Sequence, residues 1–199
     1  MATMDERLLV KKAQKGDHKA FEQLMEEHFK KIYNIAYRMT GNPDDASDMT
    51  QEVMLKLFRN IGSFKGDSKF STWVYRVATN TCLDELKKSR RHSHTSLNTE
   101  YDTGDGEITC EVEDTSPTPE EMTEKKELRG MVADAVQRLS PDHRAAIVLR
   151  DIKGFSYGEI AKILNCTEGT VKSRISRARA SLKEVLEKDF GFGGTYFKT

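Results

Sequence analysis

The chain lacks the features typical of membrane proteins and disulfide-stabilised proteins. Its three cysteines, Cys82, Cys110 and Cys166, are widely separated and form no CxxC spacing, so they provide no disulfide framework. No apolar run approaches the roughly 20 residues that a membrane-spanning helix needs. Charged residues interrupt residues 1–17, where a secretory signal needs a continuous apolar segment. We therefore expect a cytoplasmic protein with reduced thiols.

The chain also lacks the motifs of common enzymes. It has no Gly-rich phosphate loop, no paired-histidine helix motif and no nucleophile signature. Among its five histidines, only His92 and His94 form a close pair, and in such a polar segment solvated imidazoles are more frequent than metal ligands. We therefore expect no enzyme, no catalytic residue, no bound metal and no cofactor.

Net charge is zero overall, but the charges are unevenly distributed along the chain. Residues 1–91 carry 17 basic and 13 acidic side chains, whereas residues 92–124 carry 10 acidic side chains and no Lys or Arg. Residues 125–199 carry 15 basic and 9 acidic side chains. Two basic lobes are therefore separated by an acidic segment.

The first lobe, residues 1–92, is predicted to be helical. An apolar stripe with helical spacing extends from Phe21 to Met39, and the sequence Gly41-Asn42-Pro43 ends it. Further helices are expected over residues 44–60 and 70–91, on either side of a polar loop. No strand pattern competes with these helices, so we expect an all-α fold.

The second lobe, residues 119–190, is predicted to follow a flexible linker. Residues 93–118 are acidic, rich in Ser, Thr, Asp and Gly, and without helical period. Pro119 followed by acidic residues indicates a helix start, and Ser140-Pro141 indicates another. The tail, residues 191–199, contains too much glycine for a stable helix, and we assign it no role.

Residues 155–179 have the pattern of a helix-turn-helix motif. Ser156 and Glu159 form a capping-box pattern for a first helix, which is predicted to end at Asn165. Thr167 is the expected cap of a second helix, whose buried stripe follows spacings of four, three and four: Val171, Ile175, Ala178 and Leu182.

The opposite face of this second helix is predicted to be basic and rich in hydroxyl groups. Lys172, Ser173, Ser176, Arg177 and Ala180 lie opposite the stripe, with Arg174 and Arg179 at its flanks. Such a face suits the DNA major groove, where Lys and Arg donate to guanine acceptors. The alternative is a solvated amphipathic helix, with the two flanking arginines covering apolar surface with their stems.

Two further faces lie in the first lobe. Trp73, Arg76, Asn80, Lys87 and Arg91 gather on one side of the helix over residues 70–91, a mixture suited to unstacked bases and phosphates. The competing interpretation places Trp73 in the core and leaves the cations solvated. On the preceding helix, a spacing of four aligns acidic side chains in a ridge suited to a basic protein: Asp44, Asp48 and Glu52.

The chain resembles the bacterial extracytoplasmic-function sigma factors of the sigma-70 superfamily. Three segments in family order carry the resemblance: DDASDMTQEVMLKLF, FKGDSKFSTWVYRVATNTCLDELKKSRR and SYGEIAKILNCTEGTVKSRISRARASL. It implies a transcription initiation factor whose partners are core RNA polymerase, promoter DNA and commonly an anti-sigma factor, although no residue identifies the last. The small Ser176 and the Gly-rich tail depart from the family pattern and leave promoter preference open.

The resemblance also implies roles for individual residues. Contact with the clamp coiled coil of the largest polymerase subunit would involve Asp48, Gln51 and Glu52. Recognition of the minus-ten element, with capture of a flipped base, would involve Phe64, Lys65, Asp67, Ser68, Trp73, Arg76 and Asn80, with Lys87, Arg90 and Arg91 on the adjacent duplex backbone. Recognition of the minus-thirty-five element would involve Thr170, Lys172, Ser173, Arg174, Ser176, Arg177 and Arg179.

Two other functions remain open from the residues alone. An operator-binding helix-turn-helix regulator would bind DNA without polymerase, usually as a dimer. A purely protein-binding regulator, such as an anti-sigma factor, would leave the basic face over residues 172–177 without a role. For the sigma factor, we expect two separate modules that the linker holds apart until polymerase aligns them.

Overall fold

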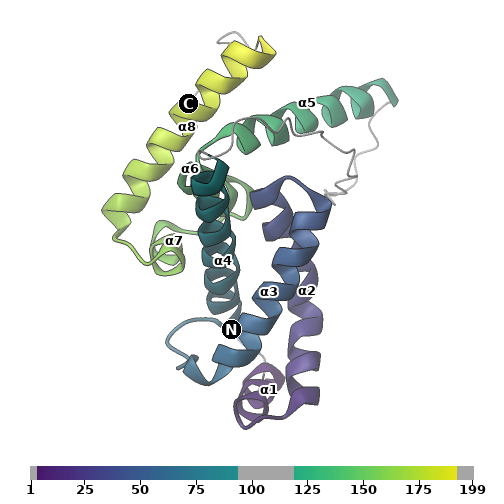
Figure 1. Ribbon diagram of the computed structural model, residues 1–199, viewed down its shortest axis with the longest axis vertical. Helices are drawn as coiled ribbons and strands as arrows, with labels where there is room; N and C mark the ends of the chain where they lie inside the picture. The colour runs from purple at the N-terminus through teal and green to yellow at the C-terminus, as the bar shows by residue number, and fades with distance from the viewer. Residues whose placement is uncertain (1–3, 94–118, 192–199) are drawn as a thin grey trace.

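The computed structural model describes residues 4–93 and 119–191, and within them every regular element is helical (Figure 1). The first lobe contains α1 (Met4–Gln14), α2 (His18–Thr40), α3 (Pro43–Asn60), η1 (Ile61–Ser63) and α4 (Phe70–Ser93). The second contains α5 (Pro119–Arg138), α6 (Pro141–Ile147), η2 (Val148–Ile152), α7 (Tyr157–Leu164) and α8 (Glu168–Phe190). The all-α prediction is confirmed. Most of the predicted linker, residues 94–118, and the tail from residue 192 lie outside the described residues.

The helix boundaries of the first lobe follow from its capping residues. Gly41 ends α2 in the left-handed conformation, with φ of 79°, and its N–H donates to the carbonyl of Tyr37. A residue with a Cβ is strained at this φ, which accounts for glycine here. The side chain of Asn42 then accepts hydrogen bonds from the N–H groups of Asp44 and Asp45, and so caps α3. The predicted break at Gly41-Asn42-Pro43 is confirmed.

Helix α1 was not predicted, because charged residues interrupt its short apolar pattern. Val10 and Ala13 are nevertheless buried against the first lobe. At the end of α1, the amide of Gln14 donates to the carbonyls of Ile61 and Phe64, at 3.1 and 2.8 Å. The helix therefore positions the start of the loop between η1 and α4.

In the second lobe, helix α5 begins at Pro119, the helix start that the sequence indicates, and the next helix begins after Ser140. The Ser140 hydroxyl accepts a hydrogen bond from the N–H of His143 and caps α6. The π-helical turn η2 continues α6 directly. Helix α8 then runs along the outer side of the second lobe and packs on α5, α6 and α7 (Figure 1).

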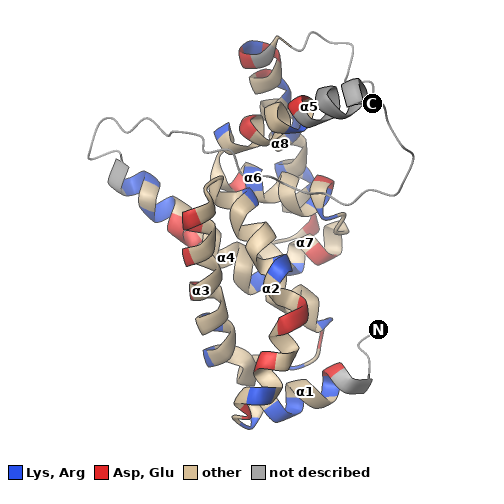
Figure 2. Ribbon diagram, turned by 90° about the vertical axis from the view of Figure 1, so that its right-hand side faces the viewer, with Lys and Arg blue, Asp and Glu red and all other residues tan. Residues whose placement is uncertain are grey.

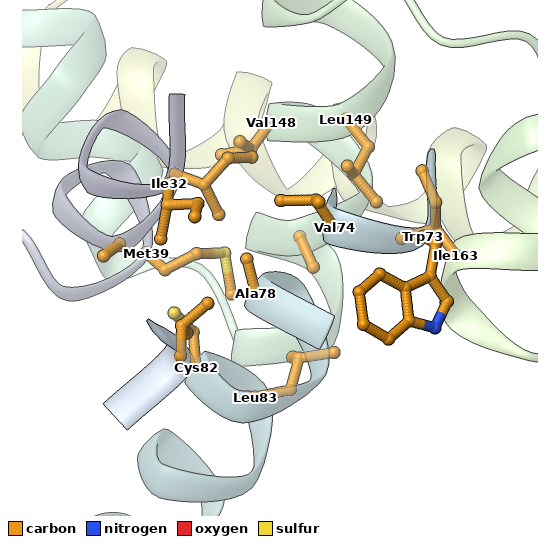
Figure 3. Packing of buried hydrophobic residues seen from close by; sticks show 14 of the residues in the cluster. Ile32, Met39, Trp73, Val74, Ala78, Cys82, Leu83, Val148, Leu149 and Ile163 are labelled. Carbon is orange, nitrogen blue, oxygen red and sulfur yellow. The ribbon is translucent and has the colours of Figure 1, made fainter. Parts of the chain in front are cut away.

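The two lobes are packed against each other, whereas the sequence led us to expect modules held apart. Helix α4 contacts α6 and α7, and α2 contacts α5 and α6. Figure 3 shows Val74 and Ala78 of α4 in one buried cluster with Val148, Leu149 and Ile163 of the second lobe. The amphipathic pattern identified these residues as core positions but did not show that one core is shared between the lobes.

Candidate nucleic-acid interface

The helix-turn-helix motif is built by the caps that the sequence predicts. The Ser156 hydroxyl accepts from the N–H of Glu159 at 3.3 Å, and the Glu159 carboxylate accepts from the Ser156 N–H at 3.0 Å. The Ser156 hydroxyl also donates to this carboxylate at 2.8 Å, and these hydrogen bonds lower the pKa of Glu159. The predicted capping box is therefore confirmed.

The turn between α7 and α8 is short and sharply bent. Asn165 adopts the left-handed conformation with φ of 50°, and its N–H donates to the carbonyl of Ala161. Asn tolerates this conformation better than most residues. Thr167 then caps α8 by accepting from the N–H of Thr170 at 3.2 Å, as predicted.

The buried and exposed faces of α8 agree with the sequence prediction. Val171, Ile175 and Ala178 are at most 2% exposed, and Leu182 is half-buried. The residues that are exposed on the other face are Thr170, Lys172, Ser173, Ser176 and Arg177. The helix therefore presents cations and hydroxyl groups outward.

The flanking arginines of α8 are bound to carboxylates of the same lobe. Arg174 lies 3.5 Å from Asp142 at the start of α6. Arg179 makes a two-point contact with Asp151 of η2, which includes an Nε to Oδ2 distance of 3.2 Å and raises the pKa of Arg179. The ammonium of Lys172 lies 5.8 Å from the ring centre of Tyr157. These contacts position cations at both edges of the exposed face of α8.

In the loop before α4, some of the predicted minus-ten residues are exposed and others are packed. Lys65 and Asp67 are exposed, and Ser68 is partly exposed. The ring of Phe64, in contrast, packs on Phe70 and Trp73, with ring centres 5.2 and 5.6 Å apart.

Trp73 itself is only 3% exposed in this arrangement of the lobes. It lies beside Ile163 of α7 in the buried cluster (Figure 3). The packed interpretation of Trp73 therefore describes this structure, and base stacking by its ring stays a prediction.

Among the remaining predicted residues of α4, some are exposed to solvent and others contact the second lobe. Arg76 is exposed. The amide of Asn80 donates to the carbonyl of Ile163 in α7 at 3.2 Å, and the guanidinium of Arg90 donates to the carbonyl of Leu139 at 3.0 Å. Lys87 lies 3.1 Å from Asp142 of α6, and Arg91 donates to the backbone of its own helix. Figure 2 shows the basic end of α4. The second lobe therefore contacts much of the predicted minus-ten face.

The acidic ridge of α3 is solvent-accessible. Asp44, Asp48 and Gln51 are exposed, whereas Glu52 is partly exposed and lies 3.5 Å from Lys56. Leu55, which the sequence analysis did not single out, is 50% exposed and follows Gln51 by one helical turn. Protein interfaces often contain an exposed apolar side chain of this kind. The amphipathic pattern of the sequence alone could not distinguish Leu55 from a core leucine.

The described residues contain no cluster of three or more His, Cys, Asp or Glu side chains that could hold a metal ion. His94, one member of the close histidine pair, lies outside them. No helix in the described part of the chain is long and apolar enough to cross a membrane.

The fold and these surfaces define a two-module helical DNA-binding protein with a helix-turn-helix in its second module. Residues 24–92 match the family described as sigma-70 region 2, and residues 129–182 match the family described as sigma-70 region 4. The chain belongs to the sigma-70 family, in its extracytoplasmic-function (ECF) group.

Individual relatives show the same similarity over nearly the whole chain. The RNA polymerase sigma-H factor of Pseudomonas aeruginosa is 36% identical over 179 residues, which cover 90% of this chain and 92% of that protein. The ECF RNA polymerase sigma-E factor of Escherichia coli K12 is 37% identical over 184 residues, which cover 92% and 95%. Among solved structures, the sigma factor RpoE in complex with the anti-sigma factor NepR from Bartonella quintana matches with a TM-score of 0.61 and 27% identity, over 86% of this chain and 99% of that chain.

Proposed function

We propose that this sigma factor binds core RNA polymerase through α3 and directs it to promoters through α8 and α4. The observation that carries the proposal is the exposed basic face of α8, because it is presented by a capped helix-turn-helix in a chain of this family. Such factors supply the sequence recognition that the core enzyme lacks, and this one performs no catalytic step of its own. It acts in the cytoplasm, together with polymerase.

The α8 face is suited to read the minus-thirty-five element. Lys172 and Arg177 are exposed and long enough to donate to guanine N7 and O6, while Ser173 and Ser176 provide shorter contacts. Arg174 and Arg179 lie at the edges of this face, where phosphates would be met. Their ion pairs with Asp142 and Asp151 hold them there before DNA arrives.

The loop before α4 and the face of α4 are suited to the minus-ten element. A flipped base needs a π-face and polar groups for its edge, and the adjacent backbone needs cations. Trp73 supplies the π-face and Asn80 the polar groups. The cations are Lys87, Arg90 and Arg91. Binding of an extruded base offsets part of the few kcal/mol that unstacking costs, so promoter melting needs no ATP hydrolysis.

The α3 ridge is suited to polymerase because it combines carboxylates with an exposed apolar side chain. Asp48, Gln51 and Glu52 would meet basic residues, and Leu55 would be covered on binding. We therefore expect Asp48→Lys together with Glu52→Lys to weaken binding of core polymerase by about tenfold or more, since like charges across an interface are unfavourable.

This effect is measured by fluorescence anisotropy of the labelled factor titrated with core polymerase. The charge-matched control is Glu22→Lys together with Glu26→Lys, two exposed positions on α2, where the neighbouring Phe21 packs on Phe58 near the other end of α3. Equal weakening by the control would mean that the effect comes from overall charge and not from the ridge.

An anti-sigma factor is a further proposed partner, because the Bartonella relative is bound to one. The test of the whole proposal is run-off transcription with purified core polymerase and promoter fragments from the factor's own genome. Transcripts that depend on the factor are expected. DNA binding that neither requires nor recruits polymerase would instead identify an operator-binding regulator.

A further inference from the structure

We propose that His28 of α2 positions the loop between η1 and α4, and that it does so only while its imidazole is neutral. The inference rests on the proposed function of this loop, residues 64–69, at the minus-ten element. His28 acts through Phe70 and does not itself contact DNA. Three observations carry the inference: the aromatic base of the loop, an unpartnered nitrogen of His28 and the charges that act on its ring.

The loop is closed at its base by aromatic side chains. Phe64 stands before the loop's polar residues and Phe70 after them, and their ring centres lie 5.2 Å apart. The indole of Trp73 packs on both, with ring centres 5.6 Å from Phe64 and 5.5 Å from Phe70. Lys65 and Asp67, between the two phenylalanines, are exposed. Their positions therefore depend on how firmly this aromatic base is held.

His28 supports the aromatic base from below. Its side chain is 3% exposed, and its ring meets that of Phe70 edge-on, with centres 5.4 Å apart and an interplanar angle of 61°. The start of the loop is held separately, because the Gln14 amide donates to the carbonyls of Ile61 and Phe64. The loop thus has two supports. The amide of Gln14 does not titrate, whereas an imidazole does.

One nitrogen of His28 makes protonation of the ring unfavourable. The Nδ1 atom is buried and has no hydrogen-bond partner. A neutral imidazole can leave one nitrogen as an acceptor, but both nitrogens of an imidazolium are donors. Protonation would bury an unpaired N–H of a cation, and a cation–π contact with Phe70 offsets only part of the lost hydration. A protonated His28 therefore turns toward water and withdraws its support from Phe70.

The charges around His28 act in the same direction overall. Burial lowers its pKa below the ordinary 6.5, Lys31 lowers it further, and Glu27 partly opposes them. From α4, His28 meets the uncharged ring of Phe70, and the neighbouring cation, Lys69, is exposed. Among the described residues, no charge on α1, α3 or the second lobe is a cause of the shift.

The lowered pKa fixes the sign of the pH dependence. The stabilisation by neutral His28 is complete above the ordinary pKa of 6.5 and is lost as the pH falls from there through the lowered value. In mildly acidic solution the loop should therefore open more often. The carboxylate of Glu159 does not interfere in this range, because its own pKa is lowered from 4.5.

The experiment compares the wild-type chain with His28→Phe, which keeps an aromatic ring but cannot be protonated. The matched control is His18→Gln on the same helix, which removes an exposed histidine that stacks on Phe58. Amide hydrogen exchange of the free chain is measured for peptides covering residues 61–73 and for peptides covering α8, at about pH 7.5 and about pH 5.5. Comparison of variants at the same pH cancels the pH dependence of the chemical exchange step. Run-off transcription by the holoenzyme is measured at the same two pH values.

On acidification, we expect loop exchange to rise about three- to tenfold more in the wild-type chain than in His28→Phe. The upper value follows because about pH 5.5 is one unit below 6.5, where the opened form binds a proton that the closed form does not. His18→Gln should respond like the wild type, and the α8 peptides should show no difference. Run-off transcription should fall at the lower pH more with the wild type than with His28→Phe.

An equal acid response of the loop in the wild type and in a folded His28→Phe variant would overturn the inference. So would loss of the response in the His18 control. His28→Gln, which is neutral and polar, gives the same comparison if His28→Phe does not fold. Loop exchange that depends on His28, together with transcription that does not, would support the positioning role and reject the proposed function of the loop. Absence of factor-dependent transcription with every chain would likewise reject the proposed function, while hydrogen exchange would still report the role of His28.

Discussion

The faces of α8 and α4 that are proposed to bind DNA differ in their exposure: α8 presents its face to solvent, whereas α4 presents much of its face to the other lobe. Lys172, Ser176 and Arg177 are exposed, but Trp73 is buried and Asn80 donates to a carbonyl of α7. Polar and basic side chains of similar kinds are therefore exposed to solvent on α8 but in contact with the other lobe on α4. In this structure, the solvent exposure of these side chains depends on the arrangement of the lobes as well as on the period of each helix.

The largest expected effect is on the covered face. Trp73→Ala should lower the free energy of unfolding by about 3–5 kcal/mol, because it removes a large buried ring from between Phe64, Phe70 and α7. Urea denaturation followed by circular dichroism measures this. Trp73→Phe is the control and should retain most of the stability. If Trp73→Ala were as stable as wild type, the indole would not be a core side chain in the free protein.

On the exposed face, we expect a functional effect without a loss of stability. Lys172→Ala with Arg177→Ala should reduce run-off transcription at least about tenfold, since each base contact contributes about 1–3 kcal/mol of discrimination. The unfolding free energy should change little, because both residues are exposed. The control is Lys183→Ala with Lys188→Ala, which removes two cations from the far half of α8. Undiminished transcription by the Lys172 and Arg177 variant would show that this face does not read the promoter.

The smallest expected effect concerns the cap that orients the exposed face. Ser156→Ala should destabilise the second lobe by about 1 kcal/mol. Because hydrogen bonds from Ser156 lower the pKa of Glu159, the stabilisation by this carboxylate is present above its ordinary pKa of 4.5 and is lost as the pH falls through the lowered value.

Thermal unfolding at pH values above 4.5 and below the lowered pKa of Glu159 measures how much the capping carboxylate stabilises the lobe. Glu159→Gln should reduce the dependence of stability on pH. Thr167→Ala removes the cap of α8, which is a hydroxyl and not a carboxylate, and should therefore leave that dependence unchanged. A Glu159→Gln variant with the wild-type pH profile would contradict the assignment.

Local features of the fold could be predicted from sequence, because they depend on neighbours in the chain. The caps at Ser156 and Thr167, the break at Gly41 and the buried stripe of α8 all involve residues at most a few helical turns apart. The contacts between the lobes could not be predicted, because Arg144 and Asp142 have partners roughly 50 to 100 residues away. A helical period identifies a buried face but not the element that covers it.

The candidate site shows the same division. The outward face of α8 was predicted correctly, since only the period of one helix decides it. The position of Trp73 depended on whether another helix lay against it, and α7 does. The exposure of Leu55 could not be predicted either, because a leucine on an amphipathic helix looks like a core position until burial is known.

In the proposed function, two separate helix faces read two promoter elements while polymerase holds them at a fixed separation. The most direct measurement is mapping of transcript 5′ ends made by reconstituted holoenzyme on genomic DNA from the factor's own organism. We expect factor-dependent start sites preceded by two short shared motifs at nearly constant spacing, and loss of those starts with Lys172→Ala and Arg177→Ala. Start sites that share only one motif, or that appear equally without the factor, would contradict it.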